Sequence, residues 1–150
     1  MSTASSVPTF GCTCARLRKL TRRLTRIYDA HLSAQAIKVT QYSLLANAAR
    51  GERALSEFAA ELEMDRSTLS RNLAPLAAQG WVSISIGADA RSRSISLTAA
   101  GRRKLKAALP SWRKAQCEVE SVLGTEGVGE LHRKIERALA ALPVPSGKRA

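Results

Sequence analysis

Apolar residues recur along the chain with helical spacing or strand alternation, and together they mark six helical segments and one pair of strands. Over residues 12–34 they recur every three or four positions, which predicts a long amphipathic helix. The same spacing, bounded by N-cap residues and glycines, predicts further helices over 40–50, 55–62, 66–79, 99–123 and 130–142. Apolar residues alternate with serine over 82–86 and 94–97, so these segments are predicted to be half-buried strands.

The helix over 66–79 has an apolar side and a polar side. Asp65 is a favourable N-cap, and the apolar side is formed by Leu69, Leu73 and Leu76. The polar side carries hydroxyl, guanidinium and amide groups without an acidic residue: Ser67, Thr68, Arg71 and Asn72. Groups of these kinds hydrogen-bond to phosphates and to base edges. The strands that follow are joined by a loop, Gly87–Arg93, that carries Arg91 and Arg93, so the sequence over 64–97 indicates a winged helix.

Composition supports a polyanionic partner. The 150 residues carry a formal net charge of +12, and 45% of them are hydrophobic but only 4% aromatic. This charge favours nucleic acid first and an anionic membrane second. No apolar run has the length of a membrane span, and residues 1–10 lack the pattern of a signal peptide. We therefore expect a cytoplasmic protein with no membrane partner.

Three segments resemble the MarR family of bacterial transcriptional regulators. Asp89–Gly101 is similar to the family's wing signature, an Asp-x-Arg tip followed by a strand and Leu-Thr-x-x-Gly. Met64–Leu73 with Gly80-Trp81-Val82 resembles the recognition helix and its exit, and Thr40–Leu45 resembles the second helix. The resemblance extends in element order from Leu17 to Leu142, whereas Cys12-Thr13-Cys14 is not part of the family pattern.

The resemblance implies a mainly α fold with a small β-hairpin wing, in which the winged helix-turn-helix comprises residues 39–98. Residues 12–38 and 99–142 would then form a helical dimerisation region, flanked by mobile segments at 1–11 and 143–150. The sequence also favours a homodimer independently, because the helices over 99–123 and 130–142 carry more apolar surface than one small subunit can bury.

The resemblance also implies a DNA-binding mechanism. Two recognition helices of a dimer would enter successive major grooves of an inverted-repeat operator in double-stranded DNA. The candidate contacts on that helix are Arg66, Ser67, Thr68, Ser70, Arg71 and Asn72. Arg71 and Asn72 are the expected base-edge contacts. In the wing, Arg91 would enter the minor groove and Arg93 would lie near a phosphate, while Asp89 either braces the loop or only forms its turn.

Repression is the expected outcome of this binding, released by a small-molecule effector. Family effectors are commonly small aromatic acids, but the sequence does not name the ligand. A non-specific architectural DNA-binding protein is the alternative of another class. An enzyme is disfavoured because His31 and His132 stand alone, and no cofactor or metal ion is implied.

The three cysteines suggest a second means of control, a thiol-based redox switch. Cys14 shares the apolar phase of the first helix, which predicts a buried side chain, whereas Cys12 and Cys117 are predicted to be exposed. With both residues in one helix, a Cys12–Cys14 disulfide is disfavoured because their side chains diverge. A bond from either to Cys117, within the subunit or across the dimer, is the better candidate. A metal site would need a fourth ligand that the sequence does not provide.

Overall fold

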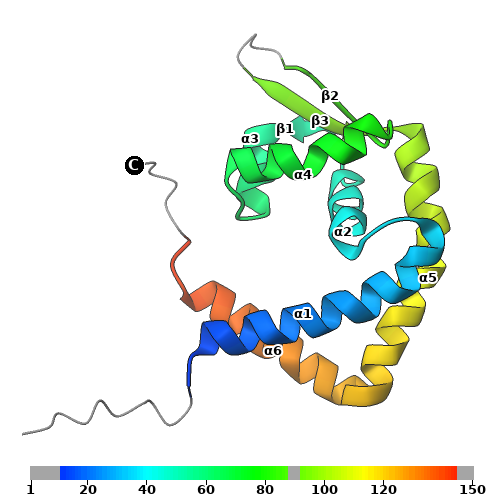
Figure 1. The fold of residues 1–150 in the computed structure, drawn as a ribbon. Helices are drawn as coiled ribbons and strands as arrows, with labels where there is room; N and C mark the ends of the chain where they lie inside the picture. The colour runs from blue at the N-terminus through cyan, green and yellow to red at the C-terminus, as the bar shows by residue number, and fades with distance from the viewer. Residues whose placement is uncertain (1–10, 88–91, 145–150) are drawn as a thin grey trace, which may run out of the picture.

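The computed structural model describes residues 11–87 and 92–144 (Figure 1). The predicted mobile segments at 1–11 and 143–150 lie almost wholly outside this range. Within it, no helix is long and apolar enough to cross a membrane. The helices are α1 (Thr13–Leu32), η1 (Ser33–Gln35), α2 (Val39–Ala48), α3 (Leu55–Glu61), α4 (Arg66–Ala78), α5 (Ala99–Leu123) and α6 (Thr125–Ala141). The strands are β1 (Arg53–Ala54), β2 (Val82–Ile86) and β3 (Arg93–Leu97).

The core of the winged helix lies between α2, α3, α4 and the sheet. The predicted apolar side of α4 is confirmed, since its three leucines are all completely buried. They pack with Leu45 of α2, Phe58 of α3 and Ile95 of β3, which are also buried. Burying side chains of this size contributes about 1.5–3 kcal/mol each. This core therefore fixes the direction of α4 and leaves its polar side toward solvent.

The sheet has the strand order β1-β3-β2 and is antiparallel throughout. The two-residue strand β1 was not predicted, because two residues carry no alternation. Arg53 holds it in place, since its guanidinium lies 4.9 Å from the centre of the Phe58 ring and 3.5 Å from Glu61. It also donates a hydrogen bond to the carbonyl of Asn47. Arg53 therefore connects β1 to both α2 and α3.

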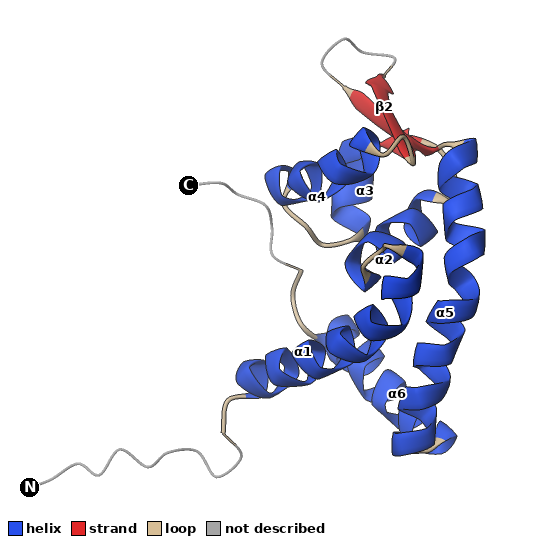
Figure 2. Ribbon diagram, turned by 45° about the vertical axis from the view of Figure 1, so that its right-hand side comes forward, coloured by secondary structure: helices blue, strands red, loops and turns tan. Residues whose placement is uncertain are grey.

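The hairpin of β2 and β3 projects beyond the body of the molecule (Figures 1 and 2). The prediction that Ile86 belongs to a half-buried face is wrong, because its side chain is 72% exposed while Val82 is buried. The predicted loop, Gly87–Arg93, also extends too far at its C-terminal end. Arg93 already pairs with Ile86 in the sheet, and the Gly87 N–H donates to the carbonyl of Ser92 at 2.9 Å. Ile86 lies beyond the part of the wing that packs on the core, so the alternation of apolar and polar residues alone does not predict its exposure.

A tight junction joins the wing to α5. Thr98 is the N-cap, as predicted, and its hydroxyl accepts a hydrogen bond from the Gly101 N–H at 3.0 Å. A Cβ atom at Gly101 would come within 2.0 Å of the Trp81 carbonyl oxygen. Only glycine fits this position, which gives the Leu-Thr-x-x-Gly pattern a direct steric cause.

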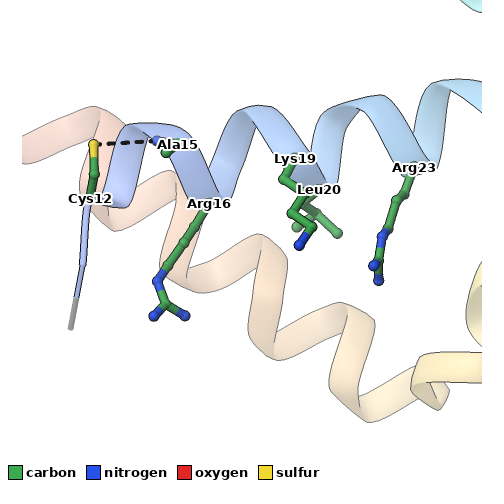
Figure 3. A pocket seen from close by; sticks show the side chains of 6 residues that line it. All are labelled: Cys12, Ala15, Arg16, Lys19, Leu20 and Arg23. Atoms are coloured by element: carbon green, nitrogen blue, oxygen red, sulfur yellow. Dashed lines mark hydrogen bonds between the residues drawn. The ribbon is translucent and has the colours of Figure 1, made fainter. Parts of the chain in front are cut away.

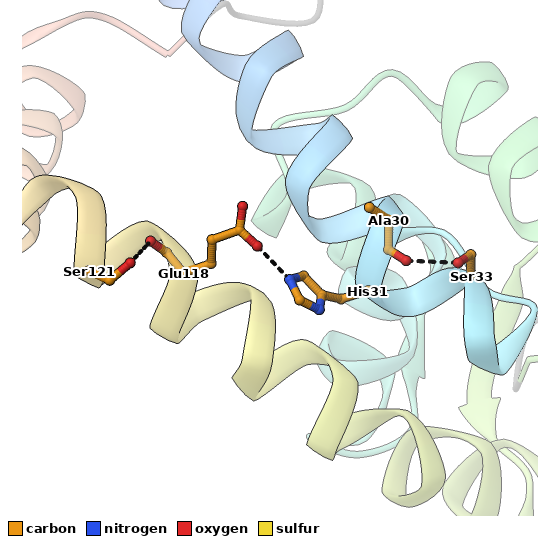
Figure 4. A network of polar contacts seen from close by, with 5 residues as sticks. All are labelled: Ala30, His31, Ser33, Glu118 and Ser121. Atoms are coloured by element: carbon orange, nitrogen blue, oxygen red, sulfur yellow. Dashed lines mark hydrogen bonds and ion pairs between the residues drawn. The ribbon is translucent and has the colours of Figure 1, made fainter.

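Polar and aromatic contacts join α5 to α1 and α2. Trp112 stacks on Tyr42 of α2 with ring centres 6.0 Å apart and also contacts Tyr28 of α1 at 6.2 Å. The Tyr28 hydroxyl donates to Gln116, and His31 lies 2.7 Å from Glu118 (Figure 4). Burial, with a smaller effect of Glu120, raises the pKa of Tyr28 above its ordinary 10.0, so this hydroxyl keeps its proton. The contact of His31 with Glu118 therefore joins α1 to α5.

Two helices outside the winged helix, α1 and α6, expose apolar side chains. α6 begins at Thr125, directly after the break at Gly124, rather than near residue 130, because Gly127 and Gly129 are accommodated inside the helix. Its leucine and isoleucine row is largely exposed, and Leu139 is 53% accessible. Leu17, in the first half of α1, is exposed as well. Within the described residues, the α6 row and Leu17 are therefore uncovered, whereas Leu20, Leu24 and Ile27 of α1 are half-buried.

Candidate nucleic-acid interface

The outward side of α4 presents the predicted contact residues to solvent. Arg66, Ser67, Ser70, Arg71 and Asn72 are exposed, and Thr68 is half-buried. The helix begins where predicted, because Asp65 has an extended backbone and its carboxylate accepts from the Thr68 N–H at 2.8 Å. The buried leucines thus orient a continuous polar surface of guanidinium, hydroxyl and amide groups.

The N-cap also engages two of the predicted contact residues. The hydroxyls of Ser67 and Thr68 each donate to the Asp65 carboxylate at 2.6 Å. These bonds, the one from Ser67 first, hold the pKa of Asp65 well below its ordinary value of 3.8. With their hydrogens directed at Asp65, the two hydroxyls offer lone pairs outward rather than donors.

The remaining residues on this side keep their donors available. Arg66, Ser70 and Asn72 form no side-chain hydrogen bond within the part of the chain that the structure describes. Arg71 makes only a long contact, 3.4 Å, to the Thr68 hydroxyl oxygen. A phosphate accepts hydrogen bonds and cannot donate them, so these four side chains are the ones suited to phosphate.

The wing contributes one described candidate. Arg93 is exposed at the outer end of β3. Next to it, Ser94 donates to Glu52 at 2.8 Å and lies 2.9 Å from the Ser85 hydroxyl, which ties the two strands to the loop before β1. Asp89 and Arg91 lie outside the described residues, so their predicted roles stay predictions.

The cysteines differ from the prediction in two respects. All three are exposed, so the prediction of a buried Cys14 is wrong, while those for Cys12 and Cys117 are confirmed. The cause is that the first turns of α1, through residue 19, stay exposed within the described part of the chain. Cys12 is the N-cap rather than a helical residue, and its sulfur accepts from the Ala15 N–H at 3.5 Å (Figure 3). The helical argument against a Cys12–Cys14 bond therefore no longer applies.

A bond between Cys12 and Cys117 of the same subunit is out of reach in this conformation. The contact between His31 and Glu118 places Cys117 beside the end of α1. Cys12 precedes His31 by 19 residues, about 28 Å along a helix, whereas a disulfide needs Cα atoms within roughly 7 Å. Among the described residues, no group of three His, Cys, Asp or Glu could hold a metal ion.

Two hollows lie outside the polar side of α4. One, of about 560 Å³, is lined by α1 residues only: Cys12, Ala15, Arg16, Lys19, Leu20 and Arg23 (Figure 3). The other, of about 430 Å³, lies where α1, η1 and α2 meet, and is lined by Asp29, Ser33, Ala36, Ile37, Lys38 and Gln41. The second hollow therefore adjoins both α1 and the winged helix.

Solved structures of other proteins share this fold. The transcriptional regulator MosR of M. tuberculosis, in complex with DNA, is 37% identical with a TM-score of 0.75, and the match covers 87% of this chain and 97% of MosR. A MarR variant of E. coli in complex with operator DNA is 22% identical with a TM-score of 0.74, covering 83% and 92%. BpsR of Bordetella bronchiseptica, whose DNA binding is regulated by 6-hydroxynicotinic acid, is 17% identical with a TM-score of 0.75, covering 87% and 95%. Comparisons with protein-family models and with curated proteins gave no match.

The match to MosR, at 37% identity, extends over 97% of the length of that regulator. Together with the polar outward side of α4, this similarity shows that the chain belongs to the MarR family of transcriptional regulators and is a DNA-binding regulator.

Proposed function

We propose that the chain acts as a homodimeric repressor that binds an inverted-repeat operator. The observation that carries this proposal is the donor-rich, exposed side of α4, held in place by a fully buried leucine side. The exposed apolar row of α6, with Leu17 of α1, supplies the surface for a second subunit. Two-fold symmetry then places the two α4 helices about 34 Å apart, one turn of DNA.

Within this complex the side chains have separate roles. Arg71 and Asn72 contact base edges, guanine for the guanidinium and adenine for the amide. Arg66 and Ser70 contact phosphates, as does Arg93 from the wing. Ser67 and Thr68 accept hydrogen bonds from base amino groups, because their own hydrogens are held by Asp65. Arg91 enters the minor groove beside the recognition helix, with Asp89 bracing its loop.

Operator selection from the DNA upstream of the gene, followed by binding assays on variants, tests these roles. Arg71→Ala is expected to cost about 1–3 kcal/mol and to relax preference at one base per half-site. Arg91→Ala is expected to weaken binding at least tenfold with the fold intact. Arg50→Ala, an exposed arginine outside α4 and the wing, is the matched control. If unrelated competitor DNA abolishes operator binding by the parent, the result would instead favour an architectural DNA-binding protein.

The hollow at the junction of α1, η1 and α2 is the proposed effector site. Its volume of about 430 Å³ suits a small molecule, and Lys38 supplies a cation for a carboxylate. Asp29 is less available, because its carboxylate accepts from the Val39 N–H at 2.7 Å. BpsR, with its response to 6-hydroxynicotinic acid, supports an aromatic acid as the effector class. Titrating operator complexes with hydroxybenzoic and hydroxynicotinic acids tests this site, and Lys38→Gln should abolish any release.

A thiol switch is the second candidate, favoured by the exposed Cys12 sulfur at the positive end of α1. Peroxide would take two electrons from two thiols, forming one disulfide and two waters. The geometry leaves Cys12–Cys14, or a bond from either to Cys117 of a second subunit. Non-reducing gels separate these pairings, since only the second gives a covalent dimer. If peroxide changes neither gel mobility nor operator affinity in the parent, the switch is a bound ligand.

A further inference from the structure

The positive charge of the chain lies outside the winged helix. Residues 39–98 contain six arginines and six acidic residues, a formal net charge of zero. Residues 1–38 contain seven lysines and arginines against one acid, and residues 99–150 contain eleven against five. The whole surplus of +12 therefore belongs to the helices of the dimerisation region and the chain ends. Attraction to a polyanion should be strongest there.

The densest part of this charge is on α1. Its six cations are Arg16, Arg18, Lys19, Arg22, Arg23 and Arg26, and all are exposed. Within residues 11–87 and 92–144, none of them forms an ion pair or a side-chain hydrogen bond. The one acid of α1, Asp29, is already bonded to the backbone of α2. Like charges three or four positions apart repel, so this arrangement weakens the helix unless an anion lies over it.

These cations form two rows along the helix. Arg18, Arg22 and Arg26 recur every four residues, and helical rotation places them opposite the apolar side of α1. This outer row therefore stays exposed when the apolar side packs on a second subunit. Arg16, Lys19 and Arg23 form the neighbouring row, and their side chains line the hollow of about 560 Å³ (Figure 3).

The outer row is remote from the DNA-binding surface. Figures 1 and 2 show α1 and α6 at one end of the molecule, while α4 and the wing occupy the other. A duplex seated on α4 and the wing leaves this row unoccupied. The charge on α1 is therefore separate from the sequence-reading surface in space as well as in sequence.

We infer that the outer row of α1 is a second, sequence-independent contact surface for the phosphate backbone of double-stranded DNA, so that one dimer holds two duplex segments. Guanidinium groups match phosphate geometry with paired hydrogen bonds. α1 contains no asparagine or glutamine to read bases. The row also lacks the aromatic side chains that single strands stack on. This inference rests on the proposed homodimer that binds DNA through α4 and the wing, and it adds a second duplex to that complex.

A bridging assay tests the inference directly. A biotinylated 30-base-pair duplex of unrelated sequence is fixed to beads, the full-length protein is added at low salt, and capture of a second, fluorescent duplex is measured. The parent is expected to capture the second duplex. Arg18→Gln/Arg22→Gln/Arg26→Gln should reduce capture at least tenfold. Lys106→Gln/Arg113→Gln/Lys114→Gln, which removes three exposed cations from α5, should capture like the parent. Equal capture by the parent and the α1 variant, or equal loss in both variants, would overturn the inference.

Salt dependence gives a second measurement on the same proteins. Each phosphate contact contributes about 0.9 to the slope of log affinity against log salt concentration. The α1 variant should therefore lose about 2–3 from the slope that the parent shows with unrelated duplex. In an Arg71→Ala background the loss should be the same, so failure of operator recognition and failure of this inference are distinguishable. A parent that binds vesicles of anionic lipid but captures no second duplex would show that the row serves a membrane, and would overturn the inference.

Discussion

Asp65 is the N-cap of α4 and also orients two residues, Ser67 and Thr68, on its outward polar side. Its carboxylate accepts from Ser67 and from the amide and hydroxyl of Thr68, which lowers its pKa. A carboxyl whose pKa is lowered by folding stabilises the protein above its unfolded pKa of 3.8, and that contribution disappears as the pH falls below this value.

The pH dependence of stability tests this role. Asp65→Ala should unfold at lower urea concentration than the parent, with a difference that is constant above about pH 5 and shrinks below pH 4. Urea unfolding of both proteins between pH 3 and pH 7 measures it. A difference that stays constant down to pH 3 would mean that Asp65 is not bonded as described.

Glu63 has a left-handed backbone, with φ of 51°, in the turn between α3 and α4. This backbone conformation costs a residue with a Cβ atom roughly 1–2 kcal/mol, and glycine avoids part of that cost. Glu63→Gly should therefore raise the free energy of unfolding by about 0.5–1 kcal/mol, measured by urea unfolding. Glu63→Ala, which removes the charge but keeps the Cβ atom, is the control and should show no such gain.

At the level of elements, sequence periodicity predicts a helix or strand correctly where the same period also directs its apolar side chains into the core. Leu69, Leu73 and Leu76 repeat with helical spacing, and the same spacing directs them into the core, so α4 and its polar side could be predicted. Arg53 and Ala54 carry no period, and β1 exists only because β3 lies beside it. Ile86 has the period of a buried residue, but nothing in the sequence marks where the core beneath the wing ends.

The candidate DNA-binding site could likewise be predicted only in part from the sequence. Residue types on the polar side of α4 indicate DNA, but the capture of the Ser67 and Thr68 hydroxyls by Asp65 depends on side-chain rotamers. The exposure of Cys14 likewise depends on what covers the first turns of α1. A sequence shows that a helix has an apolar side, but it does not show whether the same chain or another chain covers that side.

α6 offers the clearest test of that covering partner. Leu139 lies in its exposed apolar row, whereas Ala140 points away from the row by helical rotation. Leu139→Asp should prevent dimer formation and yield unfolded or aggregated chain, because a charge would enter the shared core. Ala140→Asp should stay dimeric. Light scattering after size-exclusion chromatography compares them, and a stable folded monomer from Leu139→Asp would contradict an intertwined dimer.

At the scale of the whole molecule, the contacts divide between one well-packed unit and two incompletely covered helices. The winged helix has its own buried core, but α6 buries only Val128 within this chain, and α1 buries only Leu32. α5 connects the two parts through Trp112 and the residues around it. In the proposed dimer, movement of a second subunit along α1 and α6 would therefore reach the winged helix through α5.

If α1 and α6 complete their core only in a dimer, unfolding and dissociation are one event, and the thermal midpoint must depend on protein concentration. A dimer of 150-residue chains, with an unfolding enthalpy of ~0.7 kcal/mol per residue, should gain about 2–3 °C in Tm for each tenfold rise in concentration. Calorimetry from 2 to 200 μM measures this shift, and Ala140→Asp should reproduce it as the control. A midpoint that does not move across this range, with a single transition, would mean that each subunit folds alone and that the exposed rows of α1 and α6 do not belong to a shared core.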